Sequence, residues 1–205
     1  MGKLEVNKKA KEDSLLMTAY KLFTTKGVSK TSVSDIATTA GVGKGTFYLY
    51  FKDKYDLKNR LVAKHSAKLF RTAADKLEKS GKEVDFKEKI IFMIDSILDQ
   101  LNENQALLTF ISKNLSWGIF KNALTNVSQS DEIDFLSIYN EMLRDAPCEI
   151  KEPEIMLFMI IELISSTCYS AILYKEPVSL DKLKPYLYRS VGDIIDRHML
   201  LEVRE

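Results

Sequence analysis

The feature that most limits the fold of this chain is the scarcity of turn residues over most of its length. No proline occurs before residue 147, and the 205 residues contain only four prolines and eight glycines. A β-sandwich needs Gly/Pro turns between its many short strands, and no stretch alternates apolar with polar residues as a strand does. The sequence therefore predicts an all-α protein.

Apolar residues recur at helical spacing along most of the chain and predict about nine helices. They cover approximately residues 15–26, 33–40, 44–51, 54–80, 86–101, 105–117, 131–144, 155–174 and 180–201. Several of these helices begin at a capping residue. Ser32 with Asp35 and Asp85 with Glu88 have the spacing of a capping box. Asp53 is placed to cap the long helix that follows it.

Charge is divided unevenly between the two ends of the chain. Residues 1–64 hold 13 Lys/Arg against 6 Asp/Glu, whereas residues 65–205 hold 17 against 23. A basic segment joined to an acidic one suggests that the N-terminal part meets a polyanion such as DNA. The alternative is a basic face that is merely solvated.

Residues 41–45 hold three of the eight glycines and separate two short predicted helices. Three helices with a glycine turn between the second and the third describe a helix-turn-helix, here over about residues 32–51. Gly41 suits a turn that requires positive φ. The helix that begins near Lys44 would then direct its first residues at base edges in a major groove.

The side chains of this motif have the chemistry that DNA binding needs. Lys44 can donate to guanine, Gly45 lets the backbone approach the duplex, and Thr46 offers a hydroxyl and a methyl group. The other groups that can donate to phosphate are on Ser32, Tyr48, Tyr50 and Lys54. Phe47 and Phe51 are expected in the core beneath the helix.

The order of these residues closely resembles the DNA-binding domain of the TetR family of bacterial repressors, over roughly residues 8–68. The matching segments are Leu22-Phe23, Gly27, Thr31 to Ala37, Ala40 to Tyr48 and Tyr50 to Lys54. The resemblance implies an all-helical homodimer, with a helix-turn-helix domain at 8–68 and a helical dimerisation and effector-binding domain at 69–205. It also implies DNA contacts at Ser32, Lys44, Gly45, Thr46, Tyr48, Tyr50 and Lys54. Tyr50 stands where histidine is common, and its hydroxyl can still donate to phosphate.

The sequence lacks the usual patterns for catalysis and for nucleotide or metal binding. Gly45 is followed by Thr46, so the P-loop pattern fails, and so does G-x-G-x-x-G. No H-x-x-x-H, C-x-x-C or G-x-S-x-G occurs. We therefore expect no enzyme activity, no cofactor and no metal site. Cys148 and Cys168 are expected to be inert thiols, with a thiol sensor as the alternative.

Residues 155–174 form a strongly apolar stretch that is long enough to span a bilayer. Glu162 near its middle would be costly in lipid, so we expect a helix buried in protein on nearly all sides and no membrane insertion. The resemblance implies that the helices at 155–174 and 180–201 pair with their copies in a homodimer. The apolar stripe assigned to the second of these helices is Leu183, Leu187, Val191, Ile194 and Ile195.

A small-molecule effector is expected to occupy a largely apolar pocket between the helices at 86–144 and 155–174. The candidate ligand-binding residues are Phe110, Asn114, Trp117, Phe120, Tyr139, Met142, Phe158, Glu162 and Tyr169. Each aromatic residue has an alternative role in the core. Glu162 could bind a cationic ligand or pair with Lys or Arg across the dimer interface.

These observations together predict a TetR-like transcriptional regulator, a repressor that binds a pseudo-palindromic operator as a homodimer and is released by an effector. Residues 1–5 lead into charge rather than an apolar signal, so a cytoplasmic location is expected. The alternatives are an activator, a DNA-binding protein without an effector, or a helical small-molecule enzyme.

Overall fold

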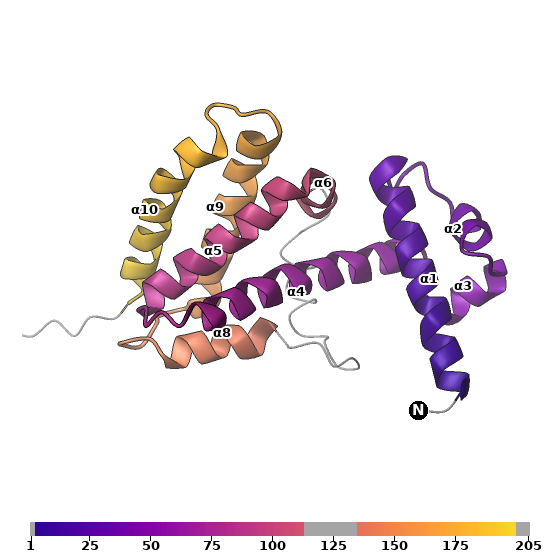
Figure 1. Ribbon diagram of the computed structural model, residues 1–205, viewed down its shortest axis with the longest axis horizontal. Helices are drawn as coiled ribbons and strands as arrows, with labels where there is room; N and C mark the ends of the chain where they lie inside the picture. Colours follow the sequence, from indigo (N-terminus) through magenta and orange to yellow (C-terminus); the bar gives the residue numbers. More distant parts are fainter. Residues whose placement is uncertain (1–2, 113–134, 200–205) are drawn as a thin grey trace, which may run out of the picture. The chain divides into compact units, whose positions relative to one another are not determined.

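The computed structural model describes residues 3–112 and 135–199, and Figure 1 traces their helices. Nine helices and no strand occur in these residues, which confirms the all-α prediction. The described chain forms two compact units: residues 3–65 with 109–112 make unit 1, and residues 66–108 with 135–199 make unit 2. Two helices, α4 (Lys54–Ser80) and α6 (Gln105–Ser112), run from one unit into the other along the chain.

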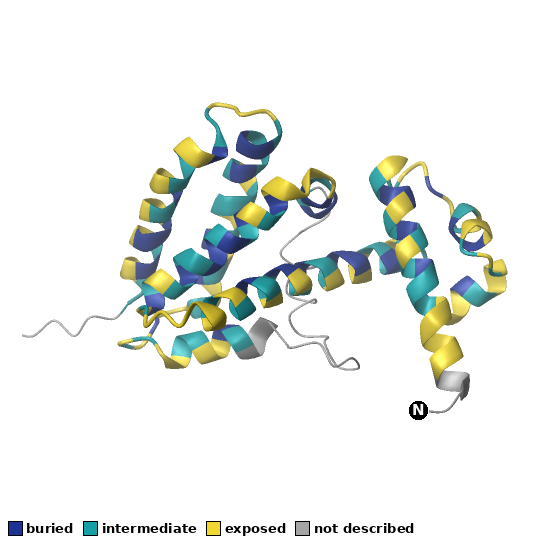
Figure 2. Cartoon of the chain, viewed as in Figure 1, coloured by how far each residue is buried: buried dark blue, intermediate teal, exposed yellow. Residues whose placement is uncertain are grey.

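Unit 1 contains three helices and the first part of α4. The helices are α1 (Lys3–Thr25), α2 (Val33–Thr39) and α3 (Lys44–Tyr50). Their inward sides form a small apolar core, in dark blue in Figure 2, that includes Leu15, Ala19, Phe23, Ile36, Phe47, Phe51, Leu57 and Leu61. The predicted helix-turn-helix is therefore supported on its inner side by apolar packing from α1 and α4.

The ends of α2 are fixed by the residues that the sequence indicates. The Ser32 hydroxyl accepts a hydrogen bond from the Asp35 N–H at 3.0 Å, and the Asp35 carboxylate accepts one from the Ser32 N–H at 2.9 Å. The Ser32 backbone N–H is the main cause of a lowered pKa of Asp35. Gly27 and Gly41 both have positive φ, +87° and +71°, as the turns on either side of α2 require.

Helix α1 begins about ten residues earlier than the apolar pattern predicts. It starts at Lys3, although the first buried residue from position 6 onward is Leu15. The early turns contain Lys, Leu, Glu and Ala, which have high intrinsic helix propensity. Residues 6–11 are exposed, so an apolar stripe could not have predicted this extension.

Unit 2 contains the rest of α4, the start of α6 and four further helices. These are α5 (Phe86–Glu103), α8 (Phe135–Arg144), α9 (Pro153–Leu173) and α10 (Leu180–His198). The capping box of Asp85 and Glu88 is present at the start of α5. Helix α10 packs against both α9 and α5. The predicted helices at 105–117 and 131–144 are confirmed as far as the described residues reach.

A polar network fixes α10 on α5. The Lys184 ammonium lies 2.6 Å from a carboxylate oxygen of Asp95 and 2.6 Å from one of Asp99. The Tyr188 hydroxyl also donates to Asp95. Although burial opposes it, the hydrogen bonds from Lys184 and Tyr188 lower the pKa of Asp95. Burial, and then Asp95 as hydrogen-bond partner, raise the pKa of Tyr188 far above its ordinary value.

Two expectations about the last two helices need correction. Only 28% of the most apolar stretch of α9 is buried, although the helix is long and apolar enough to cross a membrane. Ile155 and Met159 are exposed, so burial on nearly all sides was wrong for the single chain. Three residues of the predicted stripe of α10 are buried within the chain itself, Leu187, Val191 and Ile195, and the other two, Leu183 and Ile194, are half-buried.

Candidate nucleic-acid interface

Helix α3 has one side anchored in the core and the other side bare. Phe47 is fully buried, and Phe51, which ends the helix, is 1% exposed. Gly45 and Leu49 face away from this core, Lys44 and Tyr48 lie beside them, and all four are exposed. A short helix held from beneath by two phenylalanines, with its outer side free, is the arrangement that lets a recognition helix enter a groove.

The protein itself does not require glycine at position 45. Its φ is outside the left-handed range, and a Cβ built there would meet no atom within 4 Å. Gly41 differs, because its φ of +71° favours glycine. Glycine inside a helix is unfavourable by about 1 kcal/mol relative to alanine. The missing side chain at Gly45 therefore leaves space for a molecule outside this unit.

Three further predicted contacts lie around this surface. Ser32 is exposed at the start of α2, and Thr46 and Tyr50 are half-buried on α3. The Tyr48 ring is T-shaped to the buried Phe47 ring, with centroids 5.4 Å apart. Packing on the core thus restricts the Tyr48 ring while its surface stays open to a partner.

Lys54 has partners in its own domain. Its ammonium donates to the carbonyls of Val28 and Thr31 at 2.9 Å and to that of Ser29 at 3.3 Å. These carbonyls belong to the loop that leads into Ser32. The Lys54 side chain therefore joins the start of α4 to the start of α2, and sequence reasoning, which assigned it to phosphate, did not anticipate these bonds.

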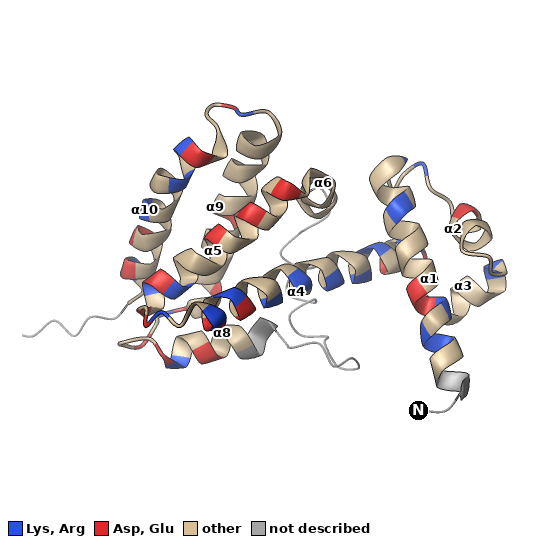
Figure 3. Cartoon of the chain, in the orientation of Figure 1, with Lys and Arg blue, Asp and Glu red and all other residues tan. Residues whose placement is uncertain are grey.

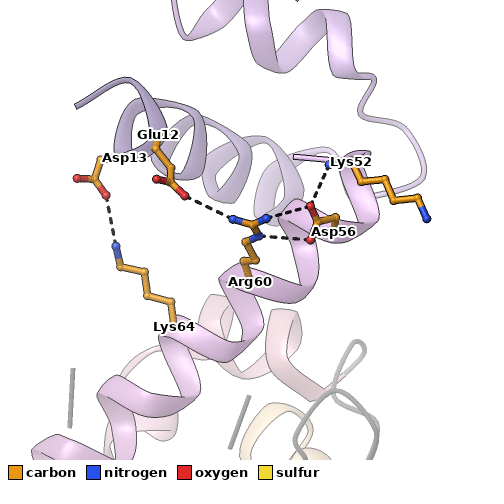
Figure 4. A network of polar contacts seen from close by, with 6 residues as sticks. All are labelled: Glu12, Asp13, Lys52, Asp56, Arg60 and Lys64. Atoms are coloured by element: carbon orange, nitrogen blue, oxygen red, sulfur yellow. Dashed lines mark hydrogen bonds and ion pairs between the residues drawn. The ribbon is translucent and has the colours of Figure 1, made fainter. Parts of the chain in front are cut away.

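A network of exposed charges joins α1 to α4 (Figure 4). Arg60 lies 3.5 Å from Glu12 and 3.3 Å from Asp56, and Lys64 lies 3.5 Å from Asp13. The Asp56 carboxylate also accepts the Lys52 backbone N–H at 2.9 Å. Exposed pairs contribute little individually, so the network mainly orients the segment that carries Lys52.

The Lys52 side chain is a cation that the sequence analysis did not single out. It is exposed, and Figure 4 shows it pointing away from the network that holds its backbone. It lies two residues after the end of α3, in the same unit as Lys44, and Figure 3 shows further Lys and Arg residues, in blue, along α1 and α4. Its position after the predicted recognition helix could have signalled it, because a lysine there can reach phosphate.

Comparison with known proteins decides the family. The sequence model described as bacterial regulatory proteins, tetR family, matches residues 15–61, which span this helix-turn-helix. The helix-turn-helix domain at the N-terminus is a TetR-family domain. It is 27% identical to the HTH-type transcriptional regulator YhgD of Bacillus subtilis over 178 residues, 82% of this chain and 86% of that protein. A 43-residue segment is 51% identical to the regulator AcrR of Shigella flexneri, covering 21% and 20% of the two chains.

Solved structures show the same fold over nearly the whole chain. A TetR-family structure from Syntrophomonas wolfei has a TM-score of 0.65 at 18% identity and covers 96% of this chain and 99% of its own. The regulator FadR of Bacillus subtilis, solved in complex with stearoyl-CoA, has a TM-score of 0.60 at 20% identity, with coverage of 87% and 96%. These likenesses show the fold, whereas the matched family model and the likeness to YhgD identify a DNA-binding transcription regulator of the TetR family.

The residues predicted to bind an effector do not all share one location in this TetR-family chain. Phe110 is buried in unit 1, where its ring contacts the rings of Tyr20, Phe23 and His65. Asn114, Trp117 and Phe120 lie outside the described residues. Phe110 therefore has neighbours in the core of the DNA-binding unit.

The remaining five candidates lie on α8 and α9 in unit 2. The Tyr139 hydroxyl donates to the Pro153 carbonyl at 2.7 Å, and burial raises the pKa of Tyr139 far above its ordinary value. Phe158 and Glu162 are exposed on α9, and Met142 and Tyr169 are half-buried. Tyr139 thus points inward, whereas Phe158 and Glu162 belong to the exposed side of α9.

Two buried serines were not among the residues that the sequence indicated. The hydroxyls of Ser66 on α4 and Ser96 on α5 have no hydrogen-bond partner, and each residue is 6% exposed. A buried hydroxyl without a partner costs about 1–3 kcal/mol. Nothing in the sequence marks them, because an isolated serine in a helix is usually exposed.

Proposed function

We propose that this TetR-family regulator is a repressor that binds a pseudo-palindromic operator as a homodimer and releases it when a small molecule binds. The observation that carries the proposal is the build of α3. Phe47 anchors its inner side, while Lys44, Gly45 and Tyr48 are exposed on its outer side. The net charge of +7 over residues 1–64 supports a polyanionic partner.

The residues divide between reading bases and binding phosphate. Lys44 donates to guanine, and Thr46, on the other side of the helix, contacts a second base edge. Phosphate contacts come from Ser32, Tyr48 and Tyr50, with Lys52 added from its exposed position. Lys54 acts indirectly, since its ammonium holds the loop before Ser32 through three carbonyls.

The exposed apolar side of α9 supports dimerisation. Ile155, Phe158 and Met159 are exposed, and their spacing of three and four residues places them together on one side of α9. A contiguous apolar surface of this kind commonly marks a protein interface. A second copy related by a two-fold axis places like against like, so α9 and the outer side of α10 cover their copies. Glu162 then lies at the interface rather than in lipid.

An effector site inside unit 2 is supported by Ser96. Its unpartnered hydroxyl lies on α5 among buried apolar residues such as Met93 and Ile94. A largely apolar ligand with one polar group would satisfy this hydroxyl. The binding of stearoyl-CoA by the FadR protein of the same fold is compatible with a ligand that carries a long apolar chain.

Release of DNA follows from a difference in effector affinity between two states. Helices α4 and α6 each continue from unit 2 into unit 1, so an effector that shifts either helix in unit 2 changes the position of its other end. Two helix-turn-helix domains must meet successive major grooves about 34–36 Å apart. A change in their spacing therefore weakens binding to both half-sites at once.

The test is selection of bound duplexes from a random pool by the full-length protein at about 150 mM salt. An enriched pseudo-palindrome supports a dimeric, sequence-specific regulator. Binding without enrichment that disappears as salt rises contradicts it, because only charge attraction would remain. Transcription from a reporter that carries the selected site separates a repressor from an activator.

Ligand-binding and turnover measurements on the same protein test two other functions. If calorimetric titration with acyl-CoA thioesters and other apolar compounds gives no binding, a DNA-binding protein without an effector is favoured. Turnover of any such compound would favour an enzyme, for which the described residues offer no group of three or more His, Cys, Asp or Glu that could hold a metal. A cytoplasmic location follows from binding chromosomal DNA.

A further inference from the structure

Leu49 is the most exposed large apolar residue in the described part of the chain. Its side chain is 79% exposed on α3, the helix that carries Lys44 and Thr46. Exposed leucines occur singly on many surfaces. This one lies in the middle of the surface assigned to DNA, where most neighbouring side chains are polar or charged.

The geometry of α3 places Leu49 at the outermost point of the helix. Successive residues advance by 100° around a helix, so the direction opposite the buried Phe47 falls between Gly45 and Leu49. These two residues are four apart and therefore lie one above the other. Lys44 and Tyr48 flank them on one side, and Thr46 on the other.

Gly45 leaves the neighbourhood of Leu49 open. Beyond its two chain neighbours and the backbone of its own helix, a Cβ at position 45 would meet no atom within 4 Å, so the helix turn next to Leu49 is open. The outermost line of α3 is thus a bare backbone turn followed by one apolar side chain. A partner can therefore approach the backbone closely at Gly45 and contact a branched aliphatic side chain at Leu49.

The chemistry of the major groove contains one apolar group, the C5 methyl of thymine. We propose that Leu49 binds a thymine methyl in each half-site and so contributes to the choice of operator sequence. The inference rests on the proposed function and extends it to a base contact that hydrogen-bonding residues do not supply. The nearby cations Lys44 and Lys52, both exposed, favour a polyanionic partner at this surface over an apolar protein.

The experiment removes the methyl from the DNA and the side chain from the protein. In the selected operator, each thymine is replaced in turn by deoxyuridine, which lacks only the C5 methyl. Wild-type protein is expected to bind at least one such duplex about fourfold more weakly, the factor that corresponds to about 0.8 kcal/mol for one methyl-sized group. Leu49→Ala is expected to bind the thymine and uracil forms of that site equally.

Two variants serve as controls. Met17→Ala removes a similarly exposed apolar side chain, 74% exposed on α1, and should keep the full penalty for deoxyuridine. Val6→Ala shortens another exposed apolar side chain of α1, 54% exposed, and should also keep it. Thermal unfolding of Leu49→Ala should match the wild type, because an exposed residue contributes little to the core.

The outcomes distinguish a failure of the Leu49 contact from a failure of the proposed function. If wild-type protein selects a site but Leu49→Ala keeps the full deoxyuridine penalty at every thymine, the role of Leu49 is overturned while the regulator stands. If no deoxyuridine weakens the wild type, the methyl contact is overturned as well. If the wild type enriches no sequence, the proposed function itself fails, and this inference falls with it.

Discussion

The ring of Phe110 on α6 meets the ring of Tyr20 on α1 edge to face, with centroids 5.4 Å apart and planes at 86°. The ring of His65 of α4 is tilted against the same tyrosine, with centroids 4.3 Å apart. Three helices thus meet at one aromatic group within unit 1. Because α6 enters from unit 2 along the chain, Phe110 fixes the end of that helix to the DNA-binding unit.

Phe110→Ala is therefore expected to destabilise the protein by about 3–5 kcal/mol, as for other buried phenylalanines. Phe110→Leu keeps most of the volume and is expected to cost less than about 1.5 kcal/mol. Urea denaturation of the full chain measures both values. Met17→Ala, exposed on α1, is the control and should lie within about 0.5 kcal/mol of wild type. Equal stability of Phe110→Ala and the control would contradict the packing role.

Lys44 and Lys54 should respond differently to removal of their charge. Lys44→Ala is expected to lose about 1–3 kcal/mol of discrimination at its base pair and to leave folding unchanged. Lys54→Met deprives three carbonyls of their donor. It should lower the unfolding free energy by about 1.5–3 kcal/mol, the range for hydrogen bonds to charged groups.

Thermal unfolding and operator titration of both variants check this contrast. Lys54 would instead be a direct phosphate contact if Lys54→Met kept the stability of the wild type and lost only the affinity of one such contact. Lys58→Met, another half-buried lysine on α4, controls for the general effect of removing one positive charge.

Local features of this fold could be predicted from the sequence, and features that depend on distant residues could not. The capping box at Ser32 involves residues three apart, and Gly41 follows from the geometry of one turn. The partners of Lys54 lie 23 to 26 residues away, so spacing gave no signal for them. The position of Leu49 could have been found by placing residues around α3 from Phe47.

Helix α9 shows a second limit of sequence analysis. Its composition predicts burial, but one chain leaves much of its apolar side uncovered. Hydrophobicity indicates that a surface needs a partner and does not say whether that partner is the same chain. Phe110 was ambiguous for a related reason, since an aromatic residue in an apolar helix suits a ligand site and a core equally well.

Gly45 and Gly41 offer a matched pair of substitutions. Gly45→Ala introduces a Cβ that meets no atom within 4 Å, so it should stabilise α3 by up to about 1 kcal/mol. It should nevertheless weaken operator binding, because the added methyl occupies the space where the backbone approaches DNA. Gly41→Ala forces alanine to a φ of +71° and should cost about 1–2 kcal/mol. Calorimetric melting and operator titration distinguish the two, and undiminished affinity of Gly45→Ala would contradict the close approach.

The Asp95 network should make stability depend on acid. Hydrogen bonds from Lys184 and Tyr188 outweigh burial and lower the pKa of Asp95. The folded state therefore binds this proton less readily than the unfolded state, whose pKa is about 3.9. The stabilising contribution is present above that value and is lost as pH falls through the lowered pKa of the folded state.

Asp95→Asn is accordingly expected to melt at a lower temperature than wild type at neutral pH, with the difference shrinking below about pH 4. Melting temperatures of both proteins across this pH range measure the effect. Asp193→Asn, an exposed carboxylate on α10, should follow wild type throughout. A constant difference between Asp95→Asn and wild type at every pH would exclude the carboxylate as its source.

The exposed side of α9 should determine the oligomeric state. Met159→Glu places a second carboxylate three residues before Glu162, and across a two-fold axis each copy would meet the same added charge. The variant is expected to run as a monomer of 23.4 kDa in light scattering after size exclusion, whereas the wild type runs at twice that mass. Met17→Glu adds the same charge in unit 1 and should leave the dimer intact. A palindrome is bound by one dimer that contacts both half-sites, so Met159→Glu should also lose its preference for a palindrome over a single half-site. A wild-type protein that runs as a monomer would refute the interface.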